Sequence, residues 1–192
     1  MGLFHRLIRR FLLRDVARIF THMTSEEQVC LVSCVQAFAK SKAVIAVEIG
    51  SYLGASSCCL ALGLKNSKQA KLYCVDTWEN DAMSEGKRDT YAEFLSNTKR
   101  FGDRIVPLRG KSVDVARDFD TSIDLIFFDG DHSYEGVKAD VDAWFPKVKS
   151  GGTVIMHDIG WAEGVQRVLQ EDILPVVEEK GRLPNMFLGI KK

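Results

Sequence analysis

Ionisable residues follow two apolar segments of this chain at the points where those segments end. The run 123–128 (IDLIFF) is followed by Asp129, Asp131 and His132, and the run 153–156 (TVIM) is followed by His157 and Asp158. Imidazole exchanges protons near neutral pH, and carboxylates can orient an imidazole or bind a divalent cation. These residue types therefore predict proton transfer or metal binding where the two segments end.

A second group of residues predicts a ligand that contains a nucleoside. Gly50 and Gly54 follow the apolar run 43–49 with G-x-x-x-G spacing, which permits a tight turn into a helix whose first N–H groups can hold a polar ligand end. Asp76 ends the next apolar run, where an acidic residue can accept hydrogen bonds from both hydroxyls of a ribose. Each feature alone is also typical of a structural turn, but the combination indicates a nucleoside.

Two further residues could each have one of two structural roles. Ser112 follows the third apolar run and could cap a helix or face an adenine ring. Trp78, two residues after Asp76, could cover the face of that ring or belong to the core.

The elements that must position these residues alternate along the chain from residue 43. Helical patterns cover about 55–64, the high 80s and 90s up to Gly102, 112–119, 134–148 and a segment after Trp161, and β-branched runs lie between them and at 186–192. Strands that are apolar on both faces and alternate with helices indicate an α/β fold, here a Rossmann-like, doubly wound, mostly parallel sheet with helices on both faces. Ligands bind at the carboxyl ends of such strands, so the residues above should converge. We expect one domain over residues 43–192.

Residues 1–42 are expected to form an N-terminal helical extension. Apolar residues recur every three to four positions over the first twenty residues, opposite a stripe of arginines, which predicts a basic amphipathic helix. Such a helix packs on the domain or on a second subunit of a homodimer, or lies on an anionic membrane surface as a peripheral contact. Thr24 and Glu27 have capping-box spacing at the start of a second helix.

Composition narrows the function classes. Lys and Arg number 26, as do Asp and Glu, so no basic excess favours nucleic-acid binding. No apolar run is long enough to span a bilayer. The five cysteines form no CxxC pair, which argues against a disulfide framework or a zinc site and predicts a cytoplasmic location.

Over residues 43–160 the chain resembles class I S-adenosylmethionine-dependent methyltransferases, in particular the small O-methyltransferase branch and a bacterial group with a DGDHSYEGV-type motif. The motifs that carry the resemblance are VEIGSYLGASS, the strand-end Asp76, RGKSVD, and DGDHSYEGV. The resemblance implies a cofactor site formed by Gly50 and Gly54 in its loop, Glu48, Tyr52 and Ser56 at the methionine part, Asp76 at the ribose, Gly110 and Ser112 at the adenine, and Asp129 beside the sulfonium.

The resemblance also implies a catalytic centre. His132 lies where metal-dependent relatives place a catalytic lysine, and Asp129 and Asp158 match their metal carboxylates. Ile159 stands where those relatives have Asn or Asp, and His157 precedes Asp158 instead, so magnesium or another divalent cation would be held by Asp129 and Asp158 with His157 as a helper.

The expected reaction is methylation of a small-molecule or sugar hydroxyl. His132 is the expected base that removes the proton of the acceptor hydroxyl, and Asp129 is either an alternative base or the group that orients His132. A metal bound by Asp129 and Asp158 would instead stabilise the deprotonated hydroxyl directly. His157 and Trp161 are expected to contact the acceptor. Two other functions stay open: a nicotinamide-dependent oxidoreductase, and a cofactor-binding adaptor without catalysis that uses the N-terminal helix.

Overall fold

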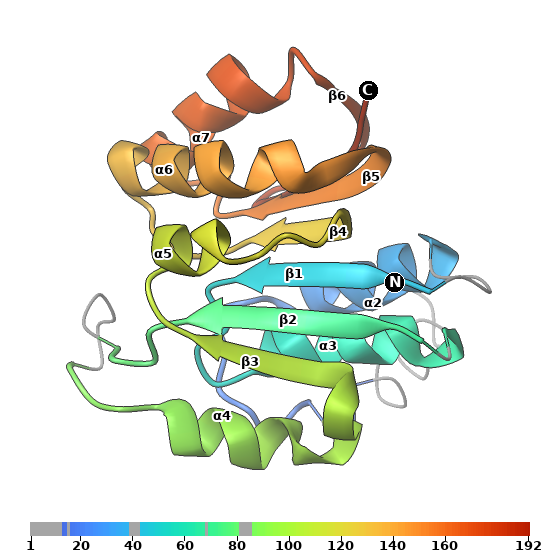
Figure 1. Cartoon of the computed structure of the whole chain (residues 1–192), viewed down its shortest axis with the longest axis vertical. Coiled ribbons are helices and arrows are strands. Elements are labelled where there is room, and N and C mark those ends of the chain that lie inside the picture. Colours follow the sequence, from blue (N-terminus) through green and yellow to red (C-terminus); the bar gives the residue numbers. More distant parts are fainter. Residues whose placement is uncertain (1–12, 15, 39–42, 68, 81–85) are drawn as a thin grey trace.

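The computed structural model describes residues 13–14, 16–38, 43–67, 69–80 and 86–192, and its centre is one seven-stranded sheet (Figure 1). The strand order is β3-β2-β1-β4-β5-β7-β6. The first five strands are parallel, and β7 runs antiparallel to both β5 and β6. The strands are β1 (Ile45–Ile49), β2 (Lys71–Asp76), β3 (Ile105–Arg109), β4 (Ile123–Phe128), β5 (Val148–His157), β6 (Val177–Leu183) and β7 (Met186–Lys191). The α/β fold class that the sequence predicted is therefore confirmed.

Helices cover both faces of the sheet (Figure 1). One face packs on α2 (Ser25–Phe38), α3 (Ala55–Gly63) and α4 (Tyr91–Thr98), and the other on α5 (Ser112–Arg117), α6 (Tyr134–Trp144) and α7 (Glu163–Val168). Successive strand residues alternate between two cores: Ala46 belongs to the first and Val47 to the second. Because side chains of a strand point to opposite faces in turn, the apolar runs seen in the sequence fill both layers.

Two element predictions differ from the structure at the C-terminal end. The helix expected over 134–148 ends at Trp144, and a 3₁₀ turn containing Pro146 follows, because proline cannot continue the helix. The strand β6 was missed: the sequence showed one strand after the last helix, but β6 pairs with β7 along the edge of the sheet. Its VEEKGRL sequence is mostly exposed, so it lacks the apolar pattern of the inner strands.

The predicted helix over residues 1–20 falls mainly on residues 1–12 and 15, outside the described part of the chain. The described residues that follow form turns, in which Leu13 accepts backbone hydrogen bonds from Val16 and Ala17. Leu13 and Val16 are buried in the same core as α2 and α3. No helix among the described residues is long and apolar enough to cross a bilayer. The predicted homodimer, the predicted membrane contact and the predicted cytoplasmic location stay predictions.

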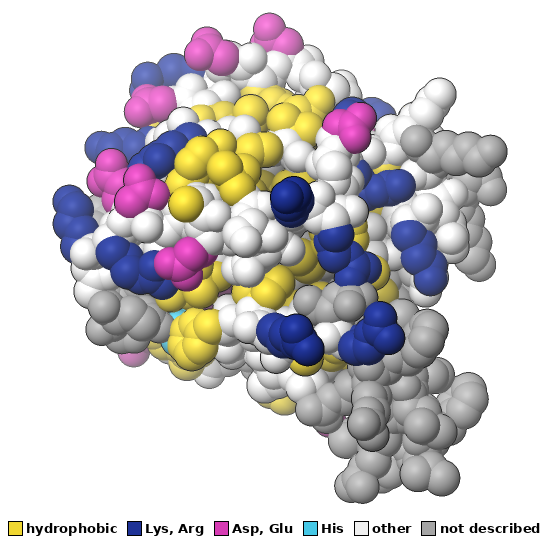
Figure 2. All heavy atoms as spheres, turned by 90° about the horizontal axis from the view of Figure 1, so that it is seen from below, with side chains coloured by type: hydrophobic (Ala, Val, Ile, Leu, Met, Phe, Trp, Pro, Cys, Tyr) yellow, Lys and Arg dark blue, Asp and Glu magenta, His cyan; other side chains and the backbone are white. Residues whose placement is uncertain are grey.

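Seen from below, the end of the molecule that carries α4 has a mixed surface (Figure 2). In this view hydrophobic side chains lie between Lys and Arg side chains, while the acidic side chains gather toward one side. The functional residues predicted from the sequence lie elsewhere, at the carboxyl ends of the strands.

Candidate functional site

A cavity of about 940 Å³ opens at the carboxyl ends of the parallel strands. Loops after β1 to β5 form its walls together with residues 20–23, which precede α2. Most residues predicted for the site line it: Gly50, Tyr52, Ser56, Asp76, Gly110, Ser112, Asp129, His132, His157, Asp158 and Trp161. Three predicted residues do not line the cavity and lie behind residues that do: Glu48, Gly54 and Trp78.

The loop after β1 is held in one conformation by Asp76 at the end of β2. Oδ2 of Asp76 accepts hydrogen bonds from the backbone N–H groups of Ser51 and Tyr52, both at 2.8 Å. Gly50 has φ 83°, and a β-carbon there would lie 2.1 Å from the carbonyl oxygen of Asp129. Only glycine fits this close crossing of two strand ends. The loop is therefore preformed around a carboxylate that also faces the cavity.

Glu48 lies beneath this loop, although the sequence placed it at the cofactor. Its Oε2 accepts hydrogen bonds from the hydroxyls of Ser51 and Ser57, whereas Oε1 is buried without a partner. Burial raises the pKa of Glu48 to about 7, and the hydroxyl hydrogen bonds lower it in part. The correction follows from its position: Glu48 is the next-to-last residue of β1, so its side chain points to a sheet face and not to the strand end.

Trp78 and Gly54 also support the loop from behind. Trp78 has no exposed surface, its ring packs on Tyr91 and Phe94, and its Nε1 donates a 2.9 Å hydrogen bond to the carbonyl of Tyr52. Of the two interpretations of Trp78, the structure therefore supports a core residue, since no part of its side chain is exposed to cover an adenine ring. Gly54 has φ 88° and lies against Phe94, where a β-carbon would approach that ring to 3.1 Å.

The far end of the cavity lies between the loop after β3 and helix α6. Gly110 and Ser112 line it as expected, but Ser112 does not cap α5. Its hydroxyl accepts a 2.8 Å hydrogen bond from Nε1 of Trp144. Asp140 of α6 also lines this end and was missed. The signal was present, because Asp140 interrupts the buried face formed by Val137, Val141 and Trp144.

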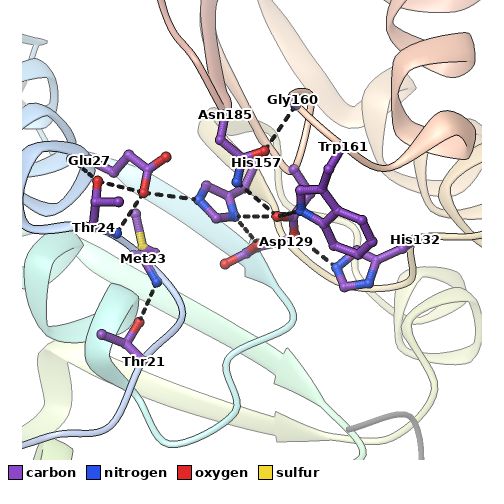
Figure 3. Close-up of polar contacts among 11 residues, drawn as sticks. Thr21, Met23, Thr24, Glu27, Asp129, His132, His157, Gly160, Trp161 and Asn185 are labelled. Atoms are coloured by element: carbon purple, nitrogen blue, oxygen red, sulfur yellow. Dashed lines mark hydrogen bonds and ion pairs between the residues drawn. The ribbon is translucent and has the colours of Figure 1, made fainter. Parts of the chain in front are cut away.

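Two imidazoles and two carboxylates meet in the wall of the same cavity, at the carboxyl ends of β4 and β5 (Figure 3). Nδ1 of His157 lies 3.0 Å from Asp129 Oδ1 and 3.3 Å from Asp158 Oδ1. Nε2 of His132 lies 2.9 Å from Asp158 Oδ2. The sequence prediction that these strand ends converge is thus confirmed.

The two histidines differ in exposure and in charge. Burial favours the neutral form of His157, but its hydrogen bonds to Asp129 and Asp158 outweigh this and raise its pKa to about 11. Only 3% of its side chain is exposed, so it holds the carboxylates and has little surface for the acceptor contact expected from the sequence. His132 is 42% exposed, and its hydrogen bond to Asp158 raises its pKa.

The carboxylates carry opposite pKa shifts. Burial raises the pKa of Asp129, and the hydrogen bond from His157 limits the rise. Burial also opposes ionisation of Asp158, but hydrogen bonds from His132 and His157 hold its pKa below the usual range. Asp158 is therefore the charged acceptor at the centre of the cluster.

Helix α2 reaches the cluster from the N-terminal side, a contact that sequence reasoning missed. Oε2 of Glu27 lies 3.6 Å from Nε2 of His157 (Figure 3). The same oxygen accepts hydrogen bonds from the backbone N–H of Thr24 at 2.7 Å and from its hydroxyl at 2.8 Å. The capping box predicted from the sequence is confirmed, and its glutamate also faces the buried imidazole.

Aromatic side chains surround the mouth of the cavity. Trp161 is 60% exposed, its ring meets that of His132 edge-on at 4.9 Å, and its Nε1 donates to Asp158 Oδ1 at 2.6 Å. Phe20 is 53% exposed and packs edge-on against Tyr52 at 6.4 Å. Trp161 thus lies at the wall where the sequence placed an acceptor.

The donor set around Asp158 does not fit the metal that the resemblance implies. Asp129, His157 and Asp158 bring three candidate ligand atoms within 4.8 Å of one another. However, Asp158 Oδ1 accepts from the indole of Trp161 and, at 3.0 Å, from the amide of Asn185. The other side of that amide is fixed, because Asn185 Oδ1 accepts from the N–H of Gly160. N–H donors surround this carboxylate, whereas magnesium requires oxygen ligands.

Comparisons with known proteins agree with this geometry. A family model described as a methyltransferase domain matches residues 47–159, more than half of the chain. An uncharacterized protein, y4gI, of Sinorhizobium fredii is 31% identical over 116 residues, which cover 58% of this chain and 13% of that protein. The chain thus spans only a small part of that relative.

Solved structures share the fold. The O-methyltransferase NovP superposes with a TM-score of 0.73 at 16% identity, covering 99% of this chain and 98% of NovP. An O-methyltransferase from Bacillus cereus in complex with S-adenosylhomocysteine gives a TM-score of 0.68 at 17% identity, covering 97% and 91% of the two chains.

Proposed function

The chain belongs to the methyltransferase-domain family. From this premise we propose that it is an S-adenosylmethionine-dependent enzyme that methylates a hydroxyl group, with His132 as the base. One observation carries the proposal. An exposed imidazole at the cavity mouth is hydrogen-bonded through Nε2 to a buried, charged carboxylate, Asp158. The family match argues against a nicotinamide-dependent oxidoreductase.

The cavity has the features that the cofactor requires. We assign the ribose hydroxyls to Asp76, the adenine to the end lined by Gly110 and Ser112, and the methionine part to the loop that contains Tyr52 and Ser56. The close crossing at Gly50 places that loop directly beside Asp129. When bound, the cofactor supplies a methyl group already activated on a sulfonium.

The remaining chemical problem is the acceptor proton. The structure gives Nδ1 of His132 no hydrogen bond among the described residues, so this nitrogen is left to take the proton of the acceptor hydroxyl. The oxygen then forms its bond to the methyl carbon as the carbon–sulfur bond breaks, giving a methyl ether and S-adenosylhomocysteine. Asp158 stabilises the imidazolium that results, and the proton leaves to solvent.

His157 and Asp129 shape the space in which this happens. His157 stays protonated at neutral pH, because its pKa lies near 11, and it holds the Asp129 and Asp158 carboxylates on either side of Nδ1. Asp129 borders the cavity where the resemblance places the sulfonium, so a negative charge there favours the cationic donor. No step in this mechanism uses a metal.

The mouth of the cavity favours an acceptor with a ring. The exposed ring of Trp161 offers flat apolar surface beside the proposed base, and the exposed ring of Phe20 lies beside Tyr52 in the lining of the same cavity. Such faces bind aryl groups and the apolar faces of sugars. We therefore propose a small-molecule or sugar hydroxyl as the methyl acceptor.

Binding and transfer measurements test the proposal in sequence. Thermal shift with S-adenosylhomocysteine should stabilise the protein, and NAD should not. Transfer of labelled methyl groups should then be screened over phenols, sugars and sugar nucleotides. With an accepted substrate, His132→Ala should lower turnover about 10²- to 10⁴-fold and leave the affinity for S-adenosylhomocysteine within about twofold. Stabilisation by NAD alone, or unchanged turnover in the variant, would contradict it. Ligand binding without transfer to any acceptor would favour the adaptor reading.

A further inference from the structure

Asp140 is a buried carboxyl group that the proposed mechanism does not use. It lies on α6, is 8% exposed, and lines the cavity next to Gly130, the residue that follows Asp129. No ion pair is found for it among the described residues, and burial raises its pKa to about 6. A carboxyl group that stays buried without a cation costs folding free energy, so it needs an explanation.

Near Asp140, the chemistry of one side chain fixes which group donates and which group accepts. The indole of Trp144 can only donate, and it donates to the hydroxyl oxygen of Ser112. The Ser112 hydroxyl therefore keeps its own proton to donate, and this neighbouring hydroxyl lowers the pKa of Asp140 in part, against the larger rise that burial causes. An ionised Asp140 can only accept hydrogen bonds, and its two oxygens have several acceptor sites to offer to a ligand.

The surrounding wall suits a flat ring with one polar edge. The cavity lining near Asp140 includes the small or aliphatic residues Gly110, Val113, Gly130, Gly136 and Ala139, together with the charged Lys111 and Asp131. At Gly130 a β-carbon would lie 3.3 Å from Oδ2 of Asp140. Any larger side chain there would crowd this oxygen, so glycine leaves it uncovered.

We propose that Asp140 accepts a hydrogen bond from the exocyclic 6-amino group of the adenine and thereby selects adenosyl ligands. The inference rests on the proposed placement of the cofactor in this cavity. A buried acceptor that is left unpaired is costly, so a ligand without the amino group loses affinity by more than the hydrogen bond is worth. The buried carboxyl group that destabilises the free protein therefore also provides the selection for adenosyl ligands.

Calorimetry with two ligands tests this selection. The probes are S-adenosylhomocysteine and its analogue with hydrogen in place of the 6-amino group. The wild-type protein should bind the first at least about tenfold more tightly, the effect expected for a hydrogen bond to a charged group. In Asp140→Ala that ratio should fall below about threefold. Asp142→Ala is the matched control, since Asp142 lies on the same helix, exposed and paired with Lys138, and it should keep the wild-type ratio.

The outcomes separate this inference from the proposed function. If the wild-type protein binds both ligands equally, or Asp140→Ala keeps the full ratio, the role of Asp140 is wrong while the methyltransferase site stands. If the wild-type protein binds neither ligand, the proposed cofactor site itself is wrong. Should Asp140→Ala fail to fold, Asp140→Asn replaces it, and its ratio should lie below the wild-type ratio because the acceptor is no longer charged.

Discussion

At the scale of single residues, the two histidines of the site have different surroundings. The proposed mechanism therefore gives them different roles. His157 is enclosed by Glu27, Asp129 and Asp158, and it stays a cation that holds carboxylates in place. His132 contacts Asp158 from the cavity mouth and keeps one ring nitrogen for a ligand. Exposure and hydrogen bonding, more than residue type, decide which imidazole can act as a base.

The pH dependence of turnover follows from this assignment. The hydrogen bond to Asp158 raises the pKa of His132, and only the neutral imidazole accepts a proton. Turnover should therefore be low at acid pH and rise along a limb whose midpoint lies above the ordinary value for histidine. In His132→Ala the residual activity should lose this limb. A limb that persists unchanged in the variant would assign the base to another group.

At the scale of elements, helix α2 completes a site that the strand ends begin. Its first turn places Glu27 against His157, and its capping box fixes the glutamate in that position. A carboxylate on the far side of the imidazole favours the protonated ring and limits its motion. The N-terminal part of the chain thus contributes to the geometry of the proposed catalytic centre.

Glu27→Gln should expose this contribution. The amide can still accept from Thr24, but it removes the charge that faces His157. Turnover should fall about three- to tenfold while the affinity for S-adenosylhomocysteine changes less than about twofold, because the cofactor residues are untouched. Glu26→Gln is the matched control, since Glu26 is exposed in the same first turn. Equal turnover of the two variants would show that Glu27 only caps the helix.

The elements also show what the sequence could and could not predict. Inner parallel strands are buried on both faces, so they appear as apolar runs whose polar ends mark the site, and Asp76, Asp129, His132 and Asp158 were found in this way. The contact of Glu27 with His157 depends on how α2 packs, which spacing along one helix does not reveal. Asp140 could have been noticed as a carboxyl group on the buried face of α6, but its place in the cavity wall also depends on packing. The edge strand β6 carries mostly exposed residues and therefore shows no apolar run.

At the scale of the whole molecule, one cavity contains the proposed cofactor site, the proposed catalytic centre and the exposed aromatic rings at its mouth. Backbone conformations with positive φ cluster along it, at Tyr52, Asn80 and Asp158. Such conformations cost energy in residues other than glycine and persist only where surrounding contacts hold them. The cavity is therefore built by the whole fold and not by one loop.

The donor set around Asp158 predicts that the reaction needs no divalent cation. The N–H groups of Trp161, Asn185 and the two histidines already satisfy this carboxylate. Turnover in excess EDTA should therefore stay within about twofold of turnover with added magnesium. Inactivation by EDTA that magnesium reverses would show that the side chains rearrange around a metal.

The most direct test of the account is a crystal structure of the protein with S-adenosylhomocysteine. We expect the ribose hydroxyls at Asp76, the adenine between Ser112 and Asp140, and the sulfur facing the space between Asp129 and His132. A ligand bound outside this cavity, or with its sulfur turned away from His132, would contradict the proposed methyl transfer.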